Sequence, residues 1–189
     1  LRGFAASREN PKISVKPDPP APDRILGVDP SLRGTGFAVI ERLSRSNRAL
    51  HYGTIKNPST RPLSACLLEI RQQLADVITT WEPSTMAIES TIFVQSYRTA
   101  ITLGAARGAA ILAAAERGIA VYEYAPRSVK QAVVGRGAAQ KDQVAFMIRA
   151  LLHLTETPPP DAADALAIAI THTQAADSAA QRRQPLTRV

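Results

Sequence analysis

The sequence predicts an α/β fold with a mixed β-sheet flanked by helices, and two observations carry this prediction. Three short apolar segments joined by short links come first, and this order is typical of an antiparallel meander. A strand, a long helix and another strand follow later in the chain. That order implies a parallel pair of strands joined by a crossover helix.

The expected strands are short apolar runs bounded by turn residues. The first, RILGVD at 24–29, is closed by Asp29-Pro30, and a Gly-containing turn leads from it into the second. The fourth, TMAIES, is a short buried run that ends in an acidic residue. The remaining strands are expected at 36–43, 50–55 and 121–124.

The expected helices follow from apolar residues spaced three and four positions apart. The clearest stripe ends near Trp81-Glu82-Pro83, and its members are Leu63, Cys66, Leu67, Ile70, Leu74, Val77 and Ile78. Further helices are expected at 96–118, around 127–134, across Val144 to Leu152, and from the segment PPPDAADALAIAI onward. In that last helix Asp161, Asp164, Ala165 and Ile168 share one face.

Small residues mark one face of the 96–118 helix. Ala100, Gly104 and Gly108 recur at a spacing of four, which permits the close approach of another helix or backbone. Tight packing within the chain is slightly favoured over a contact between subunits. The single cysteine, Cys66, lies in an apolar stripe, so we expect a buried structural thiol and a reducing compartment.

The 189 residues, of which 45% are hydrophobic, suit one globular domain with two tails. Residues 1–23 are rich in proline and charge, which predicts a flexible arm. The domain is expected at 24–174, and 175–189 as a basic tail. No apolar run approaches the roughly 18 to 20 residues that span a bilayer, so we expect no membrane partner.

The chain is strongly basic. Its formal net charge is +7 and its pI is about 10.1. This balance is compatible with a polyanionic partner such as nucleic acid, although it specifies no chemistry.

Four acidic residues stand in positions with two possible meanings. Asp29 and Glu89 end the first and fourth expected strands, and Asp161 and Asp164 begin the last helix. Taken singly, they suit a turn, a strand end and a helix cap. If the last helix packs beside the strand ends, the four converge, and their repulsion then requires cations. Two Mg²⁺ ions roughly 3.5 to 4 Å apart would suit phosphodiester hydrolysis.

Five segments carry a resemblance to a known family, in the family's order: ILGVDPSLRGTGFAVI, MAIES, LGAARGAAI, EYAPRSVKQAVVGRGAAQKDQV and DAADALAIAITH. Across roughly 24–174 the chain resembles the bacterial RuvC family of Holliday junction resolvases, in the RNase H-like superfamily. The resemblance implies an RNase H-like fold with a five-stranded mixed sheet. It also implies a homodimer in which each subunit nicks one of two opposed strands of a four-way DNA junction.

The resemblance also implies the roles of single residues. Asp29, Glu89, Asp161 and Asp164 match the family's Mg²⁺-binding catalytic carboxylates, with Mn²⁺ as an expected substitute. Water would attack the phosphate and leave 5′-phosphate and 3′-hydroxyl ends.

The other residues that the resemblance marks would contact DNA. Lys130 and Lys141 match lysines near the scissile DNA, and Arg33 and Phe93 are further candidates for DNA contact. The family acts in the bacterial cytoplasm with the RuvA and RuvB branch-migration proteins.

Two positions depart from the family pattern. Ser31 stands where a glycine is usual after Asp-Pro, so the turn beyond Asp29 is expected to differ in backbone geometry. Relatives carry a junction-probing aromatic residue three positions after the glutamate, where this chain has Ile92, with Phe93 adjacent. Phe93 therefore either stacks on bases or belongs to the core.

Three other functions remain open from sequence. An RNase H-like nuclease that acts on RNA, as in the YqgF-like branch, is disfavoured by the VKQ and QKDQV segments. The turn GVDPSLRGTG also suits an actin-like ATPase or sugar kinase, although such a turn alone is weak evidence. The third is a protein that binds junctions without cutting them, which the presence of all four acids disfavours.

Overall fold

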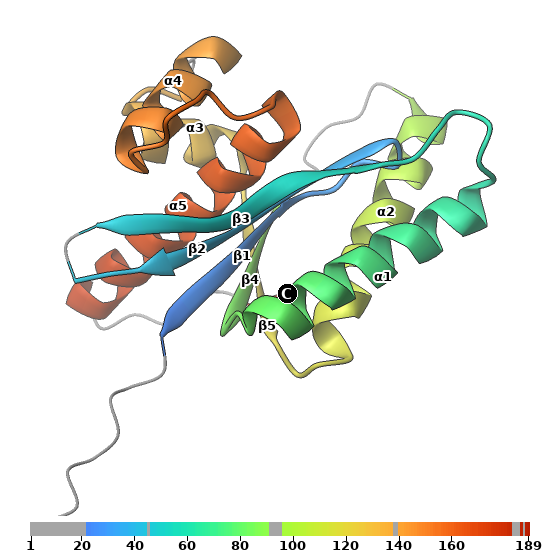
Figure 1. Ribbon diagram of the computed structural model, residues 1–189, viewed down its shortest axis with the longest axis horizontal. Helices are drawn as coiled ribbons and strands as arrows, with labels where there is room; N and C mark the ends of the chain where they lie inside the picture. The colour runs from blue at the N-terminus through green and yellow to red at the C-terminus, as the bar shows by residue number, and fades with distance from the viewer. Residues whose placement is uncertain (1–21, 45, 91–95, 138–139, 183–185, 187) are drawn as a thin grey trace, which may run out of the picture.

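The structure is a computed structural model that describes residues 22–44, 46–90, 96–137, 140–182, 186 and 188–189. Its centre is one five-stranded sheet in the order β3-β2-β1-β4-β5 (Figure 1). The strands are β1 (Asp23–Asp29), β2 (Gly34–Arg42), β3 (Asn47–Lys56), β4 (Thr85–Glu89) and β5 (Ala120–Tyr124).

Strand directions confirm the mixed sheet that the sequence predicts. β1 pairs antiparallel with β2, and β2 antiparallel with β3, which is the expected meander. β4 lies parallel to β1 on one side and to β5 on the other. The carboxyl ends of β1, β4 and β5 therefore meet at one edge of the sheet.

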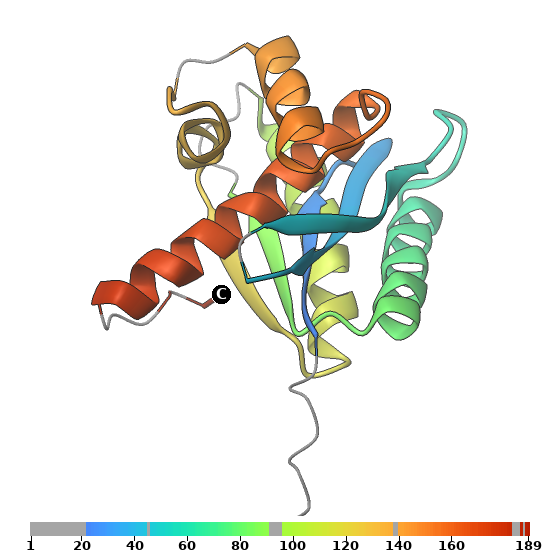
Figure 2. The ribbon, with the colours of Figure 1, turned by 60° about the vertical axis from the view of Figure 1, so that its left-hand side comes forward.

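Helices cover both faces of the sheet, as two views of the ribbon show (Figures 1 and 2). α1 (Leu63–Trp81) and α2 (Tyr97–Ala115) pack together on one face. α5 (Pro160–Arg182) crosses the other face, with α3 (Pro126–Val134) and α4 (Lys141–Leu151) packed against it. All five expected helices are confirmed. Because α5 continues to Arg182, the boundary expected at 174 falls inside a helix.

Alternation along the strands divides the core into two layers. Leu26 and Val28 point toward α1 and α2, whereas Ile25 points toward α5. Gly27, between them, is in contact with α5. Asp29 continues the α5-facing series.

The helix α1 matches the predicted stripe at all but one position. Cys66 is fully buried, as expected of a structural thiol, and the core-facing side also holds Ile70 and Leu74. Leu63 is 46% exposed, so its assignment to the stripe was wrong. It is the first residue of the helix.

The two glycines on the small-residue face of α2 have no packing partner among the residues that the structure describes. A Cβ atom added at Gly104 or Gly108 would meet no heavy atom within 4 Å among the described residues. The favoured interpretation of these glycines as intramolecular packing residues was therefore wrong. No part of the chain that the structure describes covers them.

Glycines in the sheet do permit a close approach, and the helix concerned is α5. A Cβ atom at Gly27 would collide with the carbonyl oxygen of Ala165, and one at Gly36 with that of Asp161. Two turns of the α5 backbone thus rest directly on β1 and β2. This contact sets the depth at which α5 lies on the sheet.

Among the described residues, no helix combines the length and the apolar character needed to cross a bilayer.

A substitution at Gly36 tests the close approach. Gly36→Ala forces the backbone of α5 away from β2, and such overpacking is expected to lower the free energy of unfolding by about 3 kcal/mol. Urea denaturation measures this loss. Gly53→Ala, on the same sheet, is the matched control. Its Cβ would meet only the side chain of Phe37, at 3.1 Å, and that ring can rotate to make room whereas a helix backbone cannot. Equal losses in the two variants would contradict the contact.

Candidate active site

Two strand ends place Asp29 and Glu89 side by side. Val28 pairs with Ile88 in the parallel register of β1 and β4, and the two acids are the next residues on each strand. Two positions before Asp29 is Gly27, and two positions before Glu89 is Ala87, and both of these residues face α5. Both carboxylates therefore project from the same edge of the sheet toward α5.

The first turn of α5 brings two more acids to this edge. The carbonyl of Asp161 rests on Gly36, which is the strand partner of Asp29. The carboxylate of Asp161 lies beside Gly34, where an added Cβ would be 3.0 Å from Oδ2. Asp164 follows one turn later, with 29% of its side chain exposed.

The pKa values show that the four acids interact. Burial, and then the negative charges of Asp164 and Asp161, raise the pKa of Asp29 to about 6, against the opposing charge of Lys141. Burial also raises the pKa of Glu89 to about 7, together with repulsion from Asp29 and Asp164. From the sequence, the four acids were expected to converge if the last helix packed beside the strand ends. The structure confirms that they do.

Two lysines offset this negative charge. Lys141 begins α4, and its Nζ donates a hydrogen bond to Oδ2 of Asp164 at 3.1 Å. That hydrogen bond, and then the charge of Asp164, raises the pKa of Lys141. Lys130 on α3 lowers the pKa of Glu89 through its charge. The structure thus brings both lysines to the same site as the four acids.

The turn after Asp29 is closed by Thr35, which is completely buried. Its hydroxyl donates to the carbonyl of Ser31 at 2.6 Å, and the amide of Ser31 donates back to that hydroxyl at 3.3 Å. Ser31 is not among the described residues with positive φ, so it needs no glycine-like backbone. The serine at this position is accommodated without a left-handed backbone.

Arg33 has structural partners within the chain. Its guanidinium donates to the carbonyls of Pro58 and Arg61 at 2.5 and 3.1 Å, and to Sγ of Cys66 at 3.3 Å. These bonds tie the turn to the segment before α1. Its contact with DNA stays a prediction, and Phe93 and Ile92 lie outside the described residues.

A groove next to this turn adds an arginine that the sequence did not single out. A hollow of about 430 Å³ separates the turn from the first turns of α2, and Arg33 and Arg98 line it together with Thr99 and Thr102. The signal in the sequence was Ser96, whose hydroxyl accepts from the amide of Thr99 and so marks the helix start. Arg98 is exposed in that first turn.

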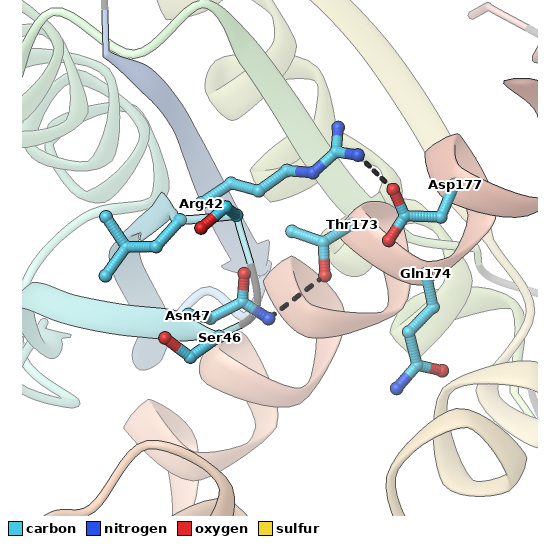
Figure 3. Close-up of a pocket in the computed structure, with 8 residues that line it drawn as sticks. Arg42, Ser46, Asn47, Thr173, Gln174 and Asp177 are labelled. Carbon is cyan, nitrogen blue, oxygen red and sulfur yellow. Dashed lines mark hydrogen bonds and ion pairs between the residues drawn. The ribbon is translucent and has the colours of Figure 1, made fainter.

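A second hollow, of about 290 Å³, lies at the opposite end of the sheet, between the β2–β3 turn and the later half of α5 (Figure 3). Arg42 pairs there with Asp177, and Asn47 donates to the hydroxyl of Thr173 at 3.3 Å. Asp177 is the single acidic residue among those that line this hollow, and Arg42 already neutralises it. This hollow therefore lacks the carboxylate cluster of the first site.

Carboxylate oxygens are the ligands that hard divalent cations prefer. As the side chains are placed, no group of three or more His, Cys, Asp or Glu residues in the described part of the chain is arranged to hold one metal ion. The donor set is nevertheless suited to such ions by its chemistry, since the acids repel one another and a cation would relieve that repulsion.

Comparison with known proteins identifies the family. The family model described as crossover junction endodeoxyribonuclease RuvC matches residues 25–172. The chain belongs to the RuvC family. A crossover junction endodeoxyribonuclease RuvC from Akkermansia muciniphila is 58% identical over 154 residues, which cover 82% of this chain and 92% of that relative.

Solved structures agree with the RuvC assignment. The structure of Thermus thermophilus RuvC in complex with Holliday junction substrate has a TM-score of 0.81 at 33% identity, covering 88% of this chain and 99% of that one. The yeast mitochondrial Holliday junction resolvase, at 13% identity, has a TM-score of 0.59 over 85% of this chain and 83% of its own, which supports the fold alone. The chain has the RNase H-like fold of this family.

The raised pKa values predict how the metal-free protein responds to pH. Carboxyls with pKa raised on folding favour the folded state most below about pH 4, and that contribution is lost as pH rises through 6 to 7. In EDTA, the melting temperature should therefore fall by a few degrees between pH 5 and pH 8. The double variant Asp29→Asn/Glu89→Gln should lose most of this change. An unaltered pH dependence in the variant would exclude these two acids as its source.

Proposed function

We propose that this protein cleaves four-way DNA junctions as a metal-dependent endonuclease. The observation that carries the proposal is the convergence of Asp29, Glu89, Asp161 and Asp164 at one sheet edge in a member of the RuvC family. The relative from Thermus thermophilus, solved with a Holliday junction, supports the choice of substrate. Paired nicks on two opposed strands would resolve the junction in recombination and repair.

Two Mg²⁺ ions are the cofactors that this donor set favours, with Mn²⁺ as a substitute. The four carboxylates would hold them, and the bound ions would supply an activated water and stabilise the leaving oxygen. Asp164 would exchange its bond to Lys141 for a metal bond. The products of water attack are a 5′-phosphate and a 3′-hydroxyl.

The basic residues around the site have a separate task. Lys141, once released from Asp164, and Lys130 can hold the phosphate next to the scissile bond. Arg98 and Arg33 line the groove beyond the turn, where a DNA strand would continue. Contacts of this kind orient the backbone and carry no sequence information.

Two opposed nicks require two sites, and we infer a homodimer formed through α2. One face of this helix exposes large apolar side chains beside the open glycines: Tyr97 is 92% exposed, Ile101 70% and Leu112 50%. Small residues in the middle of such a stripe let two backbones approach closely, as Gly104 and Gly108 would here. RuvA and RuvB as partners and a cytoplasmic location are extensions of the same proposal.

Asparagine substitutions on α5 test the nuclease function. Asp161→Asn and Asp164→Asn keep the shape and capping ability of the side chain but remove the charge that binds a divalent ion. We expect both variants to fold, to bind a labelled four-way junction, and to cut it at least about a hundredfold more slowly. Mapping of nicks in the presence of Mg²⁺ measures the rate.

Asp177→Asn on the same helix is the matched control, because Asp177 pairs with Arg42 away from the site. It should cut at the rate of the unmodified protein. The unmodified protein should nick the junction symmetrically and leave a linear duplex of the same sequence intact. Binding without nicks, or ATP binding without DNA cleavage, would contradict the proposal.

A charge on α2 tests the dimer. Ile101→Glu places a carboxylate in the apolar stripe, and desolvating it in an interface should weaken self-association at least about tenfold. Sedimentation velocity across a range of concentrations gives the dissociation constant. Leu68→Glu on α1, a position that is 52% exposed, is the control and should leave association unchanged. If Ile101→Glu left the dissociation constant of the dimer unchanged, the interface would lie elsewhere.

A further inference from the structure

A histidine lies in the apolar layer between α5 and the sheet, and both of its ring nitrogens have partners. His172 on α5 is only 5% exposed. Its Nδ1 is 2.8 Å from the hydroxyl oxygen of Tyr124 on β5, and its Nε2 is 3.4 Å from Oγ1 of Thr85 on β4. The ring of Tyr122 packs against it at 4.8 Å between centroids. One side chain of α5 therefore binds two adjacent strands.

The surroundings keep both partners of the shorter bond uncharged. Burial lowers the pKa of His172, so the ring is neutral at pH 7, and burial raises the pKa of Tyr124 to about 12, so the phenol keeps its proton. A neutral imidazole has one N–H donor and one acceptor nitrogen, and a phenol and a threonine hydroxyl can each donate or accept, so both bonds can form in either tautomer of the ring. The chain of bonds is complete and uncharged.

Tyr124 connects this chain of bonds to the carboxylate cluster. It is the strand partner of Glu89 in the β4–β5 register, and the amide of Ser90 donates to its carbonyl at 2.9 Å. Residues directly paired on neighbouring strands project to the same face of a sheet. The Tyr124 ring thus lies beside Glu89, while its hydroxyl is bound to α5.

Near the carboxylates, the other contacts of α5 with the sheet are of a different kind. On β1 and β2 the helix rests on Gly27 and Gly36, where backbone meets backbone. In the part of the chain that the structure describes, side chains of α5 bond to the sheet again only beyond His172, where Asp177 pairs with Arg42 of β2 and Thr173 accepts from Asn47 of β3. Around the two glycines the helix packs through Ala165, Leu166 and Ile168, and apolar contacts of this kind are non-directional. They set how deep the helix lies, but they resist a small slide or rotation only weakly.

We propose that His172 and Tyr124 are positioning residues for the carboxylate cluster: their hydrogen bond fixes α5 along β4 and β5, and so sets the spacing between Glu89 and Asp161 and Asp164. His172 follows Asp164 by eight residues on the same helix, a rise of about 12 Å. A rotation of the helix at His172 is therefore transmitted to the acids. The inference rests on the proposed metal-dependent nuclease.

Tyr124→Phe tests the inference by removing one hydroxyl. We expect the affinity for Mn²⁺, measured by electron paramagnetic resonance without DNA, to fall about tenfold, the lower end of the usual effect of groups that orient metal ligands. The Mg²⁺ concentration for half-maximal junction cleavage should rise by a similar factor. At saturating Mg²⁺ the rate should stay within about twofold of the unmodified protein.

Tyr122→Phe is the matched control on the same strand. Its hydroxyl accepts a hydrogen bond from Arg188 at 3.1 Å and is not bonded to His172. The affinity for Mn²⁺ should not change in this variant. An equal loss in both variants would overturn the inference, because it would show a general effect of removing a tyrosine hydroxyl from β5.

Two substitutions of His172 test the same hydrogen bond independently of Tyr124→Phe. The amide of asparagine reaches the place of Nδ1, so His172→Asn should keep the bond to Tyr124 and most of the affinity for Mn²⁺. The amide of glutamine reaches the place of Nε2, so His172→Gln should lose affinity as Tyr124→Phe does. If Tyr124→Phe does not fold, this pair still decides the question.

A structural role alone predicts a different result. In that case the variants would melt at a lower temperature while their folded fraction bound Mn²⁺ with unchanged affinity, and the inference would be wrong. Failure of the proposed function is distinguishable from this outcome. It would appear as Mn²⁺ binding by the unmodified protein without any cleavage of the junction, and the affinities would still test His172 and Tyr124.

Discussion

The direct contact of the α5 backbone with Gly27 and Gly36 is the constraint on which the rest of the site depends. The sheet alone supplies only Asp29 and Glu89, at the ends of two parallel strands. A helix resting on ordinary side chains would lie farther from the sheet, with Asp161 and Asp164 out of reach of these acids. Because the strands present glycine, the carbonyls of Asp161 and Ala165 lie against β2 and β1, and the first turn of α5 joins the sheet edge.

This arrangement concentrates like charges, and its electrostatic consequences are visible in the same residues. The pKa of Asp29 is raised to about 6 and that of Glu89 to about 7, since burial and repulsion both disfavour the ionised form. Lys141 relieves part of the repulsion through Asp164. A site that is unfavourable without cations and complete with them suits a nuclease whose substrate brings further negative charge. The repulsion among the carboxylates lowers the stability of the folded protein at the place where the site is formed.

Much of this was predictable from sequence, because strands and helices leave periodic patterns. The meander, the parallel crossover and all five helices follow from the alternation and stripes of apolar residues, and the four acids from their places at element ends. Periodicity reports which side of an element is apolar, but not what covers it. For that reason Gly104 and Gly108 were assigned to packing within the chain although none of the described residues covers them, and Leu63 to a core that it does not reach. The contacts of His172 join α5 to β4 and β5, which are distant in sequence, so no local sequence pattern could predict them.

If the packing of α5 creates a site for divalent ions between Asp29, Glu89, Asp161 and Asp164, anomalous diffraction from crystals soaked in Mn²⁺ will show them there. We expect two peaks roughly 3.5 to 4 Å apart, each within bonding distance of at least one of these carboxylates. Peaks elsewhere on the molecule, with this sheet edge unoccupied at millimolar Mn²⁺, would contradict such a site.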